Sequence, residues 1–490
     1  MDWPCGDLHG TISPMAEMID VEISPLPIER LADLLAPERA ETLRETARRG
    51  HEVLAGRTVW NLNSTAAGGG VAEMLATLLA YGRGAGVDTR WTVIHGDGEF
   101  FLLTKRIHNA LHGSPGDGWA LGDAERAGYE RIQAANLAEF APRVRPGDVV
   151  LLHDPQTAGL APGLRDSGAQ VLWRCHVGAD DSNEHTDAAW EFLRPYVSAA
   201  HGFVFTRAEY APAWIPRERL AVIPPSIDPY AVKNRDLSPE QVEQVLHLVG
   251  IGNGGPVPVP VEFVGRDGSR RRVRAHPSLL GAAPPLSPQA PAVVQVSRWD
   301  HLKDMAGVMT AFVDGVAGPH PDAQLLLVGP SVEGVTDDPE GAQVLAECRQ
   351  AWASLPPAVR DRVHLVQVPM DDLDENALIV NAIQRRADVV VQKSLAEGFG
   401  LTVTEAMWKA RPLVAGAVGG IPDQVVDGRD GILVDPRDLV ATGAAIAGLL
   451  ADPGGAARLG AAARRRARED FLGDRHLRQY VDLFAGLLRG

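Results

Sequence analysis

The sequence predicts an α/β protein made of two doubly wound, parallel-sheet domains that face each other across a cleft. Short apolar runs alternate with helical stretches along the whole chain, and the pattern occurs on both sides of a Pro-rich segment near residue 228. The runs are apolar at nearly every position, which is typical of parallel strands covered by helices on both faces. A length of 490 residues suits two large domains of this kind.

Each half of the chain contains six predicted strands. In the first half they lie near residues 57–64, 89–96, 148–155, 170–178, 202–207 and 220–228. In the second half they lie near residues 292–300, 324–330, 363–369, 387–394, 412–416 and 431–435. Helical segments such as 71–84 and 345–355 fall between them. This strand–helix–strand order predicts parallel pairing, because parallel strands need long crossover connections.

The connector between the domains is predicted just after Asp228, where Pro224, Pro225 and Pro229 stiffen the chain. We therefore expect an N-terminal domain over 1–228 and a C-terminal domain over 229–468. Residues 469–490 are predicted to form a last helix that packs back across the cleft. Its apolar residues share one helical face: Leu477, Tyr480, Val481, Phe484 and Leu488.

Residues 253–290 are interpreted as an insertion in the second domain. Apolar residues alternate there, a turn signal follows at Asp267–Gly268, and a basic strand comes next. A β-hairpin and a structureless surface loop fit this pattern equally well.

The charge and the cysteine content limit the classes of function. Lys and Arg number 47 against 63 Asp and Glu, a net charge of −16, which argues against broad binding of nucleic acid or anionic membranes. Such a surface still allows one basic pocket for a phosphorylated ligand. Cys5, Cys175 and Cys348 are too few for a disulfide framework and are predicted to be free thiols. With neither a signal peptide nor a long apolar run, a cytoplasmic protein is expected.

No sequence pattern indicates a metal site. The chain lacks zinc-ligand spacing, an HExxH helix and a nucleophile elbow. The pair Asp372 and Asp374 is the nearest match to a metal-binding acidic motif, and we interpret it as solvated surface.

The segment 387–420 carries the strongest chemical signal. A buried strand ends near Gln392, the loop AEGFG follows, and a helix begins near Thr402. Free N–H groups at a helix start suit a phosphate, and Gly398 and Gly400 allow close approach of the ligand. Glu397 and Glu405 could both accept hydrogen bonds from sugar hydroxyls. A purely structural alternative is a capping box formed by Thr402 and Glu405.

Three further strand ends carry polar or glycine residues. Arg298 and Lys303 follow the 292–300 strand and could clamp a diphosphate, although such cations are more often solvated. Gly68, Gly69 and Gly70 lie between a strand and a helix, without a Walker or dinucleotide-binding match. They fit either a substrate held against the backbone or a tight turn. The first domain also places polar side chains at strand ends that could bind sugar hydroxyls: His153, Asp154, Gln156 and His176.

Several of these motifs together resemble glycosyltransferase family 4, whose fold is the GT-B pair of Rossmann-like domains. The resemblance rests on the two glutamates in EGFGLTVTE and on the Arg298 and Lys303 pair. The strings GGGVAEML, HDPQTAG and WRCHVG resemble those of trehalose glycosyltransferring synthases. That subgroup makes trehalose reversibly, with retention, from a nucleoside-diphosphate glucose and free glucose.

The resemblance implies a role for each candidate residue. Arg298 and Lys303 would neutralise the donor diphosphate, and Glu405 would bind the donor ribose. Glu397 would hold the donor hexose and phosphate together with Gly398, Phe399, Gly400, Leu401 and Thr402. His176 would lie near the reacting carbon, and the acceptor would contact Gly69, Gly70, Asp154 and Gln156.

The resemblance also implies a set of ligands. It requires the nucleoside-diphosphate glucose as co-substrate, with no tightly bound cofactor and no obligatory metal, although Mg²⁺ is possible. The expected partners are small sugars and sugar nucleotides, and a homodimer is possible. Three alternatives stay open: a retaining trehalose phosphorylase, a glucosyltransferase with another small polyol or sugar acceptor, and a non-catalytic sugar-nucleotide sensor. The 253–290 insertion is longer than this subgroup leads us to expect.

Overall fold

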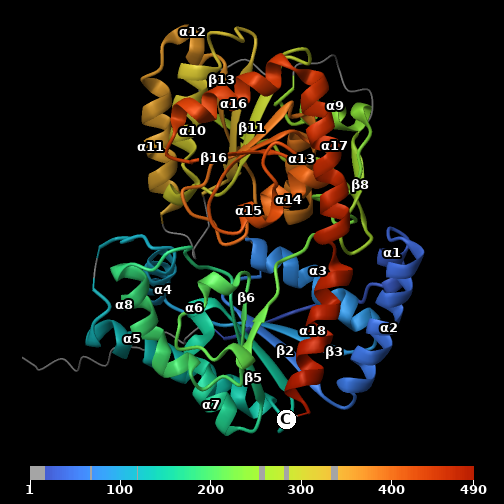
Figure 1. The fold of residues 1–490 in the computed structure, drawn as a ribbon, viewed down its shortest axis with the longest axis vertical. Helices are drawn as coiled ribbons and strands as arrows, with labels where there is room; N and C mark the ends of the chain where they lie inside the picture. The colour runs from blue at the N-terminus through green and yellow to red at the C-terminus, as the bar shows by residue number, and fades with distance from the viewer. Residues whose placement is uncertain are drawn as a thin grey trace, which may run out of the picture.

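The computed structural model describes residues 17–66, 69–118, 120–252, 260–280, 286–332 and 340–489. They form two α/β domains, one above the other in Figure 1. The predicted fold class is therefore confirmed.

The first domain contains a seven-stranded sheet in the order β1-β3-β2-β4-β5-β6-β7. Only β1 runs antiparallel to its neighbour, and the other neighbouring strands are parallel. The strands are β1 (Ile19–Val21), β2 (Thr58–Asn63), β3 (Asp88–Val93), β4 (Val149–His153), β5 (Gln170–Cys175), β6 (Gly202–Phe205) and β7 (Leu220–Val222). Its helices are α1 (Ile28–Ala32), α2 (Pro37–Val53), α3 (Gly70–Gly84), α4 (Gly98–Leu111), α5 (Asp123–Phe140), α6 (Asp154–Thr157), α7 (Ala161–Asp166) and α8 (Glu184–Val197).

The second domain repeats this plan, with the strand order β10-β13-β12-β11-β14-β15-β16 and an antiparallel edge strand, β10. The strands are β10 (Ser278–Leu280), β11 (Ala292–Val296), β12 (Gln324–Pro330), β13 (Val363–Val368), β14 (Val389–Gln392), β15 (Leu413–Gly416) and β16 (Ile432–Val434). The helices are α9 (Pro239–Leu248), α10 (Met305–Gly315), α11 (Gly341–Ala353), α12 (Pro357–Arg360), α13 (Leu373–Arg386), α14 (Leu401–Trp408), α15 (Ile421–Gln424), α16 (Leu439–Ala451) and α17 (Pro453–Asp470). A last helix, α18 (Gly473–Leu487), follows them in the sequence.

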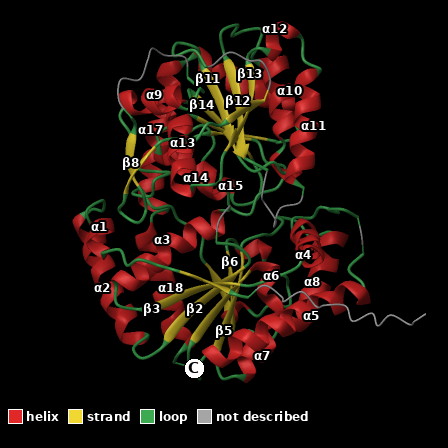
Figure 2. Ribbon diagram, turned by 180° about the vertical axis from the view of Figure 1, so that it is seen from behind, coloured by secondary structure: helices red, strands yellow, loops and turns green. Residues whose placement is uncertain are grey.

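All twelve predicted strands are present. Their apolar runs are continuous because helices cover both faces of each sheet, as Figure 2 shows. In β4, Val150 and Leu152 pack with α4, α5 and α8, whereas Val149 and Leu151 pack on the other face with Tyr480 and Phe484 of α18. The two antiparallel edge strands were not predicted from the sequence.

The last helix, α18, lies on the first domain although α17, which precedes it, packs on the second. The chain thus passes between the domains at residues 471–473, beside the connector after β7. A bridge between Ile227 and Leu472 joins the two crossing segments.

The insertion contains a β-hairpin, β8 (Glu262–Val264) and β9 (Arg270–Arg272), with Asp267 and Gly268 in its turn. The parts of the insertion at 253–259 and 281–285 lie outside the described residues. Arginines of the hairpin reach the start of α13: Arg266 pairs with Asp374 at 2.6 Å and Arg271 with Asp372 at 3.0 Å.

These contacts correct our interpretation of Asp372 and Asp374 as solvated surface. Asp372 caps α13 by accepting hydrogen bonds from two backbone N–H groups, and the side chain of Asp374 is only 3% exposed. The pair anchors the hairpin through charge-assisted hydrogen bonds.

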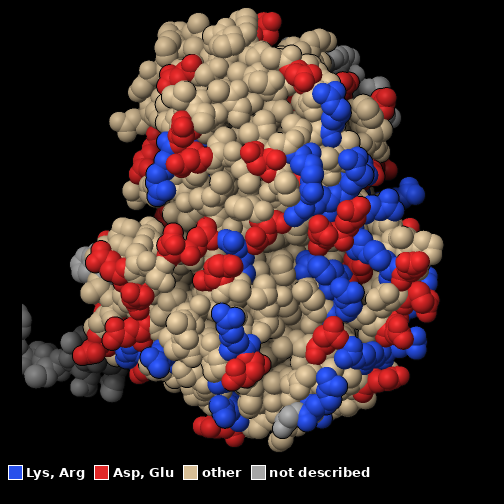
Figure 3. Space-filling view, in the orientation of Figure 1, with Lys and Arg blue, Asp and Glu red and all other residues tan. Residues whose placement is uncertain are grey.

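Cys175 and Cys348 are free and buried, as predicted, and Cys5 lies outside the described residues. Across the described part of the chain, no single helix is long and apolar enough to span a membrane, while α16 and α17, bent by 104°, pass the same test only as a pair. Acidic and basic side chains are interspersed on the face in Figure 3, and arginines of α17 and α2 gather along one side. Several are paired with carboxylates, for example Arg39 with Asp474 and Arg464 with Asp236.

Candidate functional site

The loop between β14 and α14 forms the second-domain side of the site. Gly400 precedes the helix with a φ of +85°, a left-handed conformation that favours glycine. The hydroxyl of Thr402 donates to Gln392 at 2.9 Å, so the alternative capping box with Glu405 does not form. The N-terminus of α14 therefore faces the loop without a side-chain cap, as the phosphate-binding interpretation requires.

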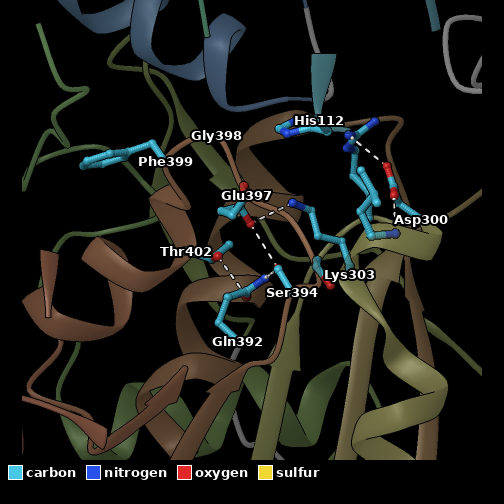
Figure 4. A network of polar contacts seen from close by, with 12 residues as sticks. His112, Asp300, Lys303, Gln392, Ser394, Glu397, Gly398, Phe399 and Thr402 are labelled. Atoms are coloured by element: carbon cyan, nitrogen blue, oxygen red, sulfur yellow. Dashed lines mark hydrogen bonds and ion pairs between the residues drawn. The ribbon is translucent and has the colours of Figure 1, made fainter. Parts of the chain in front are cut away.

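Lys303 and Glu397 meet beside this loop. They come from the ends of the paired strands β11 and β14, and the Lys303 ammonium lies 2.7 Å from the Glu397 carboxylate. The Ser394 hydroxyl donates to the same carboxylate oxygen at 3.1 Å, and Figure 4 shows the three side chains converging. The sequence prediction that these two residues share a site agrees with this geometry.

Arg298 pairs with Asp300 at 3.3 Å. The side chain of Asp300 is 1% exposed and also pairs at 3.1 Å with Lys105, which α4 brings from the first domain. Burial alone would raise the pKa of Asp300, but Arg298, Lys105 and Lys303 outweigh it and hold the pKa well below its ordinary value. Three cations from two domains therefore surround one buried carboxylate.

Sequence reasoning missed Lys105 and His112 as members of this site. His112 follows α4, and its Nδ1 lies 2.9 Å from the Gly178 carbonyl oxygen. Burial, followed by the charge of Lys303, lowers the pKa of His112 to about 4. The spacing of Lys105, His108 and His112 in TKRIHNALHG was the available signal, because residues three and four apart share a helical face.

The first-domain side contains His176 and Asp154 at adjacent strand ends. The backbone N–H of His176 donates to the Asp154 carboxylate at 2.7 Å, and its ring lies 3.0 Å from the ring nitrogen of His153. Asp154 has a φ of +62°, which is unusual outside glycine. Burial raises the pKa of Asp154 to about 7 against the opposing effects of the His176 N–H and Arg174.

The two sides touch directly. A Cβ atom added to Gly398 would lie 2.2 Å from the carbonyl oxygen of His176, and one added to Gly70 would lie 2.9 Å from the Leu401 side chain. The hydroxyl of Tyr210 donates to the carbonyl oxygens of Glu397 and Gly398, at 3.0 and 2.9 Å. The predicted first-domain and second-domain residues thus lie face to face, in a closed arrangement of the domains.

Four predicted site residues have their described contacts outside the Lys303–Glu397 pair: Phe399, Gly69, Gln156 and Glu405. Phe399 points away from Lys303 in Figure 4 and stacks edge-on against Phe471, so only its backbone can contribute to the site. Gly69 precedes α3, and the Gln156 carbonyl accepts a hydrogen bond from Gln133. The side chain of Glu405 is 3% exposed and lies 3.1 Å from Lys233, away from the Lys303–Glu397 pair.

Lys233 joins Glu405 to the first domain, because its ammonium also lies 3.0 Å from Glu73 of α3. Burial opposes the charge on Lys233, yet Glu405 and Glu73 raise its pKa above the ordinary value. The second carboxylate oxygen of Glu405 is buried without a hydrogen bond from any described residue. Such an acceptor is costly unless a ligand satisfies it.

Among the described residues no cluster of His, Cys, Asp and Glu has the arrangement of a metal site. A hollow of about 520 Å³ lies on the outer side of the second domain, beside α16 and α17, and contains none of the predicted site residues.

Comparisons with known proteins find related sequences for both halves of the chain. The family model for the trehalose synthase N-terminal domain matches residues 61–212, and that for glycosyl transferases group 1 matches residues 282–466. The chain is 33% identical over 467 residues to a trehalose synthase of Pyrococcus horikoshii, covering 94% of this chain and 96% of the relative. It is 35% identical over 440 residues to the trehalose synthase of Rubrobacter xylanophilus, covering 89% and 92%. A trehalose phosphorylase of Pleurotus sajor-caju is 27% identical, covering 77% of this chain and 51% of the relative.

Solved structures show the same fold at low sequence identity. A UDP-forming trehalose-phosphate synthase from Burkholderia vietnamiensis has a TM-score of 0.62 at 16% identity, covering 89% of this chain and all of that one. Sucrose-phosphate synthase from Thermosynechococcus elongatus has a TM-score of 0.60 at 18% identity, covering 87% and 98%. The expected GT-B fold is confirmed. With matches in both domains and full-length relatives above 30% identity, the chain belongs to the trehalose synthase family of group 1 glycosyl transferases.

Proposed function

We propose that this protein is a retaining glycosyltransferase that moves glucose between a nucleoside-diphosphate glucose and free glucose, forming or reversibly cleaving trehalose. One observation carries the proposal: Lys303 lies 2.7 Å from Glu397 in the loop before α14, and it shares the buried carboxylate Asp300 with Arg298 as an electrostatic neighbour. Cations and helix amides suit the departing diphosphate, and a carboxylate suits sugar hydroxyls.

The arrangement suits a reaction in which positive charge develops on the sugar and negative charge on the leaving phosphate. Preorganised cations and amides stabilise that change. A bound diphosphate would attract Lys303 and release Glu397, now held at 2.7 Å, to accept hydrogen bonds from the hexose. With retention, the acceptor hydroxyl attacks from the leaving-group face, and a phosphate oxygen takes its proton.

The acceptor belongs on the first-domain side in this proposal, against Gly69, Gly70, Asp154 and Gln156. His176 would lie near the reacting carbon, because its carbonyl group already touches Gly398. No protein nucleophile and no metal ion are required, and Mg²⁺ is at most an accessory to the diphosphate. Activity should therefore persist in excess EDTA, and complete loss would contradict this part of the proposal.

Glu405 supports a nucleotide donor. Its side chain is 3% exposed, and one of its oxygens has no hydrogen bond from the described residues. A ribose hydroxyl would supply the missing donor, whereas inorganic phosphate offers no reason for an acidic acceptor at this position.

A retaining trehalose phosphorylase is the second candidate. The similarity to fungal trehalose phosphorylases favours it, and Arg298 and Lys303 could hold inorganic phosphate instead of a diphosphate. A glucosyltransferase that uses another small polyol or sugar as acceptor is a third.

One experiment separates these candidates. The protein is incubated with trehalose and either inorganic phosphate or UDP, ADP or GDP, and the products are separated by anion-exchange chromatography. We expect a nucleoside-diphosphate glucose, with the α-anomer established by proton NMR. Glucose 1-phosphate would instead identify a phosphorylase, and no product from trehalose with either co-substrate would favour the third candidate.

Variants test the site itself. Arg298→Ala and Glu397→Gln should each lower turnover by about 10²-fold while the protein stays folded. Arg458→Ala is the matched control, because the side chain of Arg458 is 78% exposed and lies on α17 away from the site. Near-normal activity in both site variants would remove the assignment, and nucleotide binding without any transfer would favour a sensor.

A further inference from the structure

A buried arginine, Arg174, lies on β5 two residues before His176. Its side chain is fully buried, yet no described carboxylate forms an ion pair with it. Its N–H groups donate instead to neutral acceptors, among them the Ile223 carbonyl oxygen at 3.0 Å and the Tyr480 hydroxyl. A buried cation with no carboxylate in direct contact is costly, so a specific role for these hydrogen bonds is indicated.

One of these hydrogen bonds determines the tautomer of His176. Arg174 donates from Nε to Nδ1 of His176 at 3.3 Å, and an arginine nitrogen is always a donor. Nδ1 of His176 must therefore be unprotonated, so that its single hydrogen is on Nε2. Nε2 of His176 lies 3.0 Å from Nδ1 of His153 and donates to it. Nε2 of His153 in turn lies 3.0 Å from the side-chain oxygen of Asn61 and donates to that oxygen.

The same arginine selects the opposite tautomer of a second histidine. Nη1 of Arg174 lies 3.5 Å from Nε2 of His476 in α18, which must then be the acceptor. The hydrogen of His476 is on Nδ1, which lies 2.8 Å from the Ser226 hydroxyl in the connector. One side chain thus links the site residue His176 to both segments that cross between the domains.

The charged and titratable groups around His176 come from four elements: Arg174 from β5, His153 from β4, Asp154 from α6 and His476 from α18. The second domain faces it with the backbone of Gly398. Burial, followed by Arg174, His153 and His476, lowers the pKa of His176 well below its ordinary value. The surroundings therefore agree with the hydrogen-bond pattern in keeping the ring neutral.

We propose that Arg174 is a positioning residue that fixes His176 as the neutral Nε2–H tautomer and ties its orientation to α18 and the connector. The inference rests on the proposed function, in which His176 lies near the reacting carbon. Held this way, both ring nitrogens of His176 are occupied, Nδ1 by Arg174 and Nε2–H by His153, so the ring takes no proton from the acceptor hydroxyl. The proton then passes to the leaving phosphate, as in the front-face reaction proposed above.

Nitrogen-15 NMR of the full-length protein labelled at histidine tests the tautomers directly, without any substrate. Signals are assigned by their loss in the His176→Asn and His476→Asn proteins. We expect His176 with a protonated Nε2 and His476 with a protonated Nδ1, both unchanged between pH 6 and pH 8. A protonated Nδ1 on His176, or its titration in this range, would overturn the proposal whatever the enzyme's activity.

Two variants separate positioning from simple stabilisation. Tyr480→Phe removes one partner of Arg174 on α18 but keeps the bond to His176, so it should lower the melting temperature while leaving both tautomers and the pH profile unchanged. Arg174→Met should release Nδ1 of His176 and lower kcat/KM by about 10²-fold, with a larger loss at pH 6 than at pH 8. An Arg174→Met protein that keeps the wild-type tautomer and pH profile would refute the inference. If the Arg174→Met protein does not fold, the tautomer of His176 measured by NMR in the wild type decides whether the proposal stands.

Discussion

Gly398→Ala tests whether the two domains must touch at the site. The Cα hydrogen of Gly398 that a side chain would replace points toward the carbonyl oxygen of His176, and an added Cβ would lie 2.2 Å from it, a distance that real Cβ atoms essentially never show. Gly398 is not among the described residues with a positive φ, so alanine adds no backbone strain there. The substitution therefore acts through the interdomain contact alone.

The size of the displacement follows from the same contact. Moving the Cβ out to 3.0 Å requires at least 0.8 Å of separation, since 3.0 − 2.2 = 0.8. A shift of that size would stretch the hydrogen bond from Tyr210 to Gly398, now 2.9 Å, beyond bonding range. A misplacement near 1 Å between reacting groups costs about 10²-fold in rate. We expect kcat/KM to fall by about that factor.

The assay is steady-state transfer with the donor identified by the product experiment, alongside thermal unfolding and small-angle X-ray scattering. Because the clash lies between the domains and outside their hydrophobic cores, the unfolding temperature should change little while the radius of gyration increases. Gly128→Ala in α5 is the control, since a Cβ there meets nothing within 4 Å. Full activity of Gly398→Ala, or a loss explained by unfolding, would refute the reasoning.

Three further substitutions probe other contacts. Lys105→Met removes the ion pair that joins the two domains at Asp300, now 3.1 Å long. Initial-rate measurements should show a donor KM raised about tenfold with little change in kcat. An unchanged KM would contradict a role of Lys105 in holding the domains closed. Burial raises the pKa of Asp154 to about 7, so the folded protein keeps a proton that the unfolded chain has released, and stability is lost as the pH rises from about 4 towards 7. In calorimetric scans, the Asp154→Asn protein should therefore have a higher melting temperature than the wild type at pH 8, and this difference should shrink as the pH falls. Asparagine also tolerates the φ of +62° at this position. Asp374→Ala breaks the anchor to Arg266 and should lower the free energy of unfolding by about 2 kcal/mol with kcat unchanged, and a parallel loss of turnover would place the hairpin in the site.

The ten central strands could be predicted because burial on both faces leaves a continuous apolar signal. The edge strands β1 (IDV) and β10 (SLL) are short and interrupted by a polar residue, so they carry no such signal. The edge strands β7 (LAV) and β16 (ILV) are equally short but entirely apolar, and they were predicted. Residues at the ends of parallel strands were also predictable, because those ends meet at one edge of a sheet. Lys303 and Glu397 are 94 residues apart and still meet, through the pairing of β11 with β14.

The residues that prediction missed depend on contacts between distant elements. Lys105 reaches Asp300 from a helix of the other domain, 195 residues away, and only the closed arrangement of the domains brings them together. Asp374 resembled a surface residue because its partner Arg266 lies 108 positions earlier in a hairpin with weak sequence signals. Local patterns contain no information about such pairings.

Helix α18 follows the second domain in the sequence but packs on the first domain, and this limits where the protein can be divided. Without that helix, the face of the first sheet that Tyr480 and Phe484 now cover would expose a stripe of aliphatic side chains, among them Val149, Leu151, Leu172 and Val204. The N-terminal half is then not a self-sufficient folding unit. A functional chimera between relatives would have to carry 473–487 along with the N-terminal half, and a protein cut at the connector should aggregate unless that helix is supplied in trans.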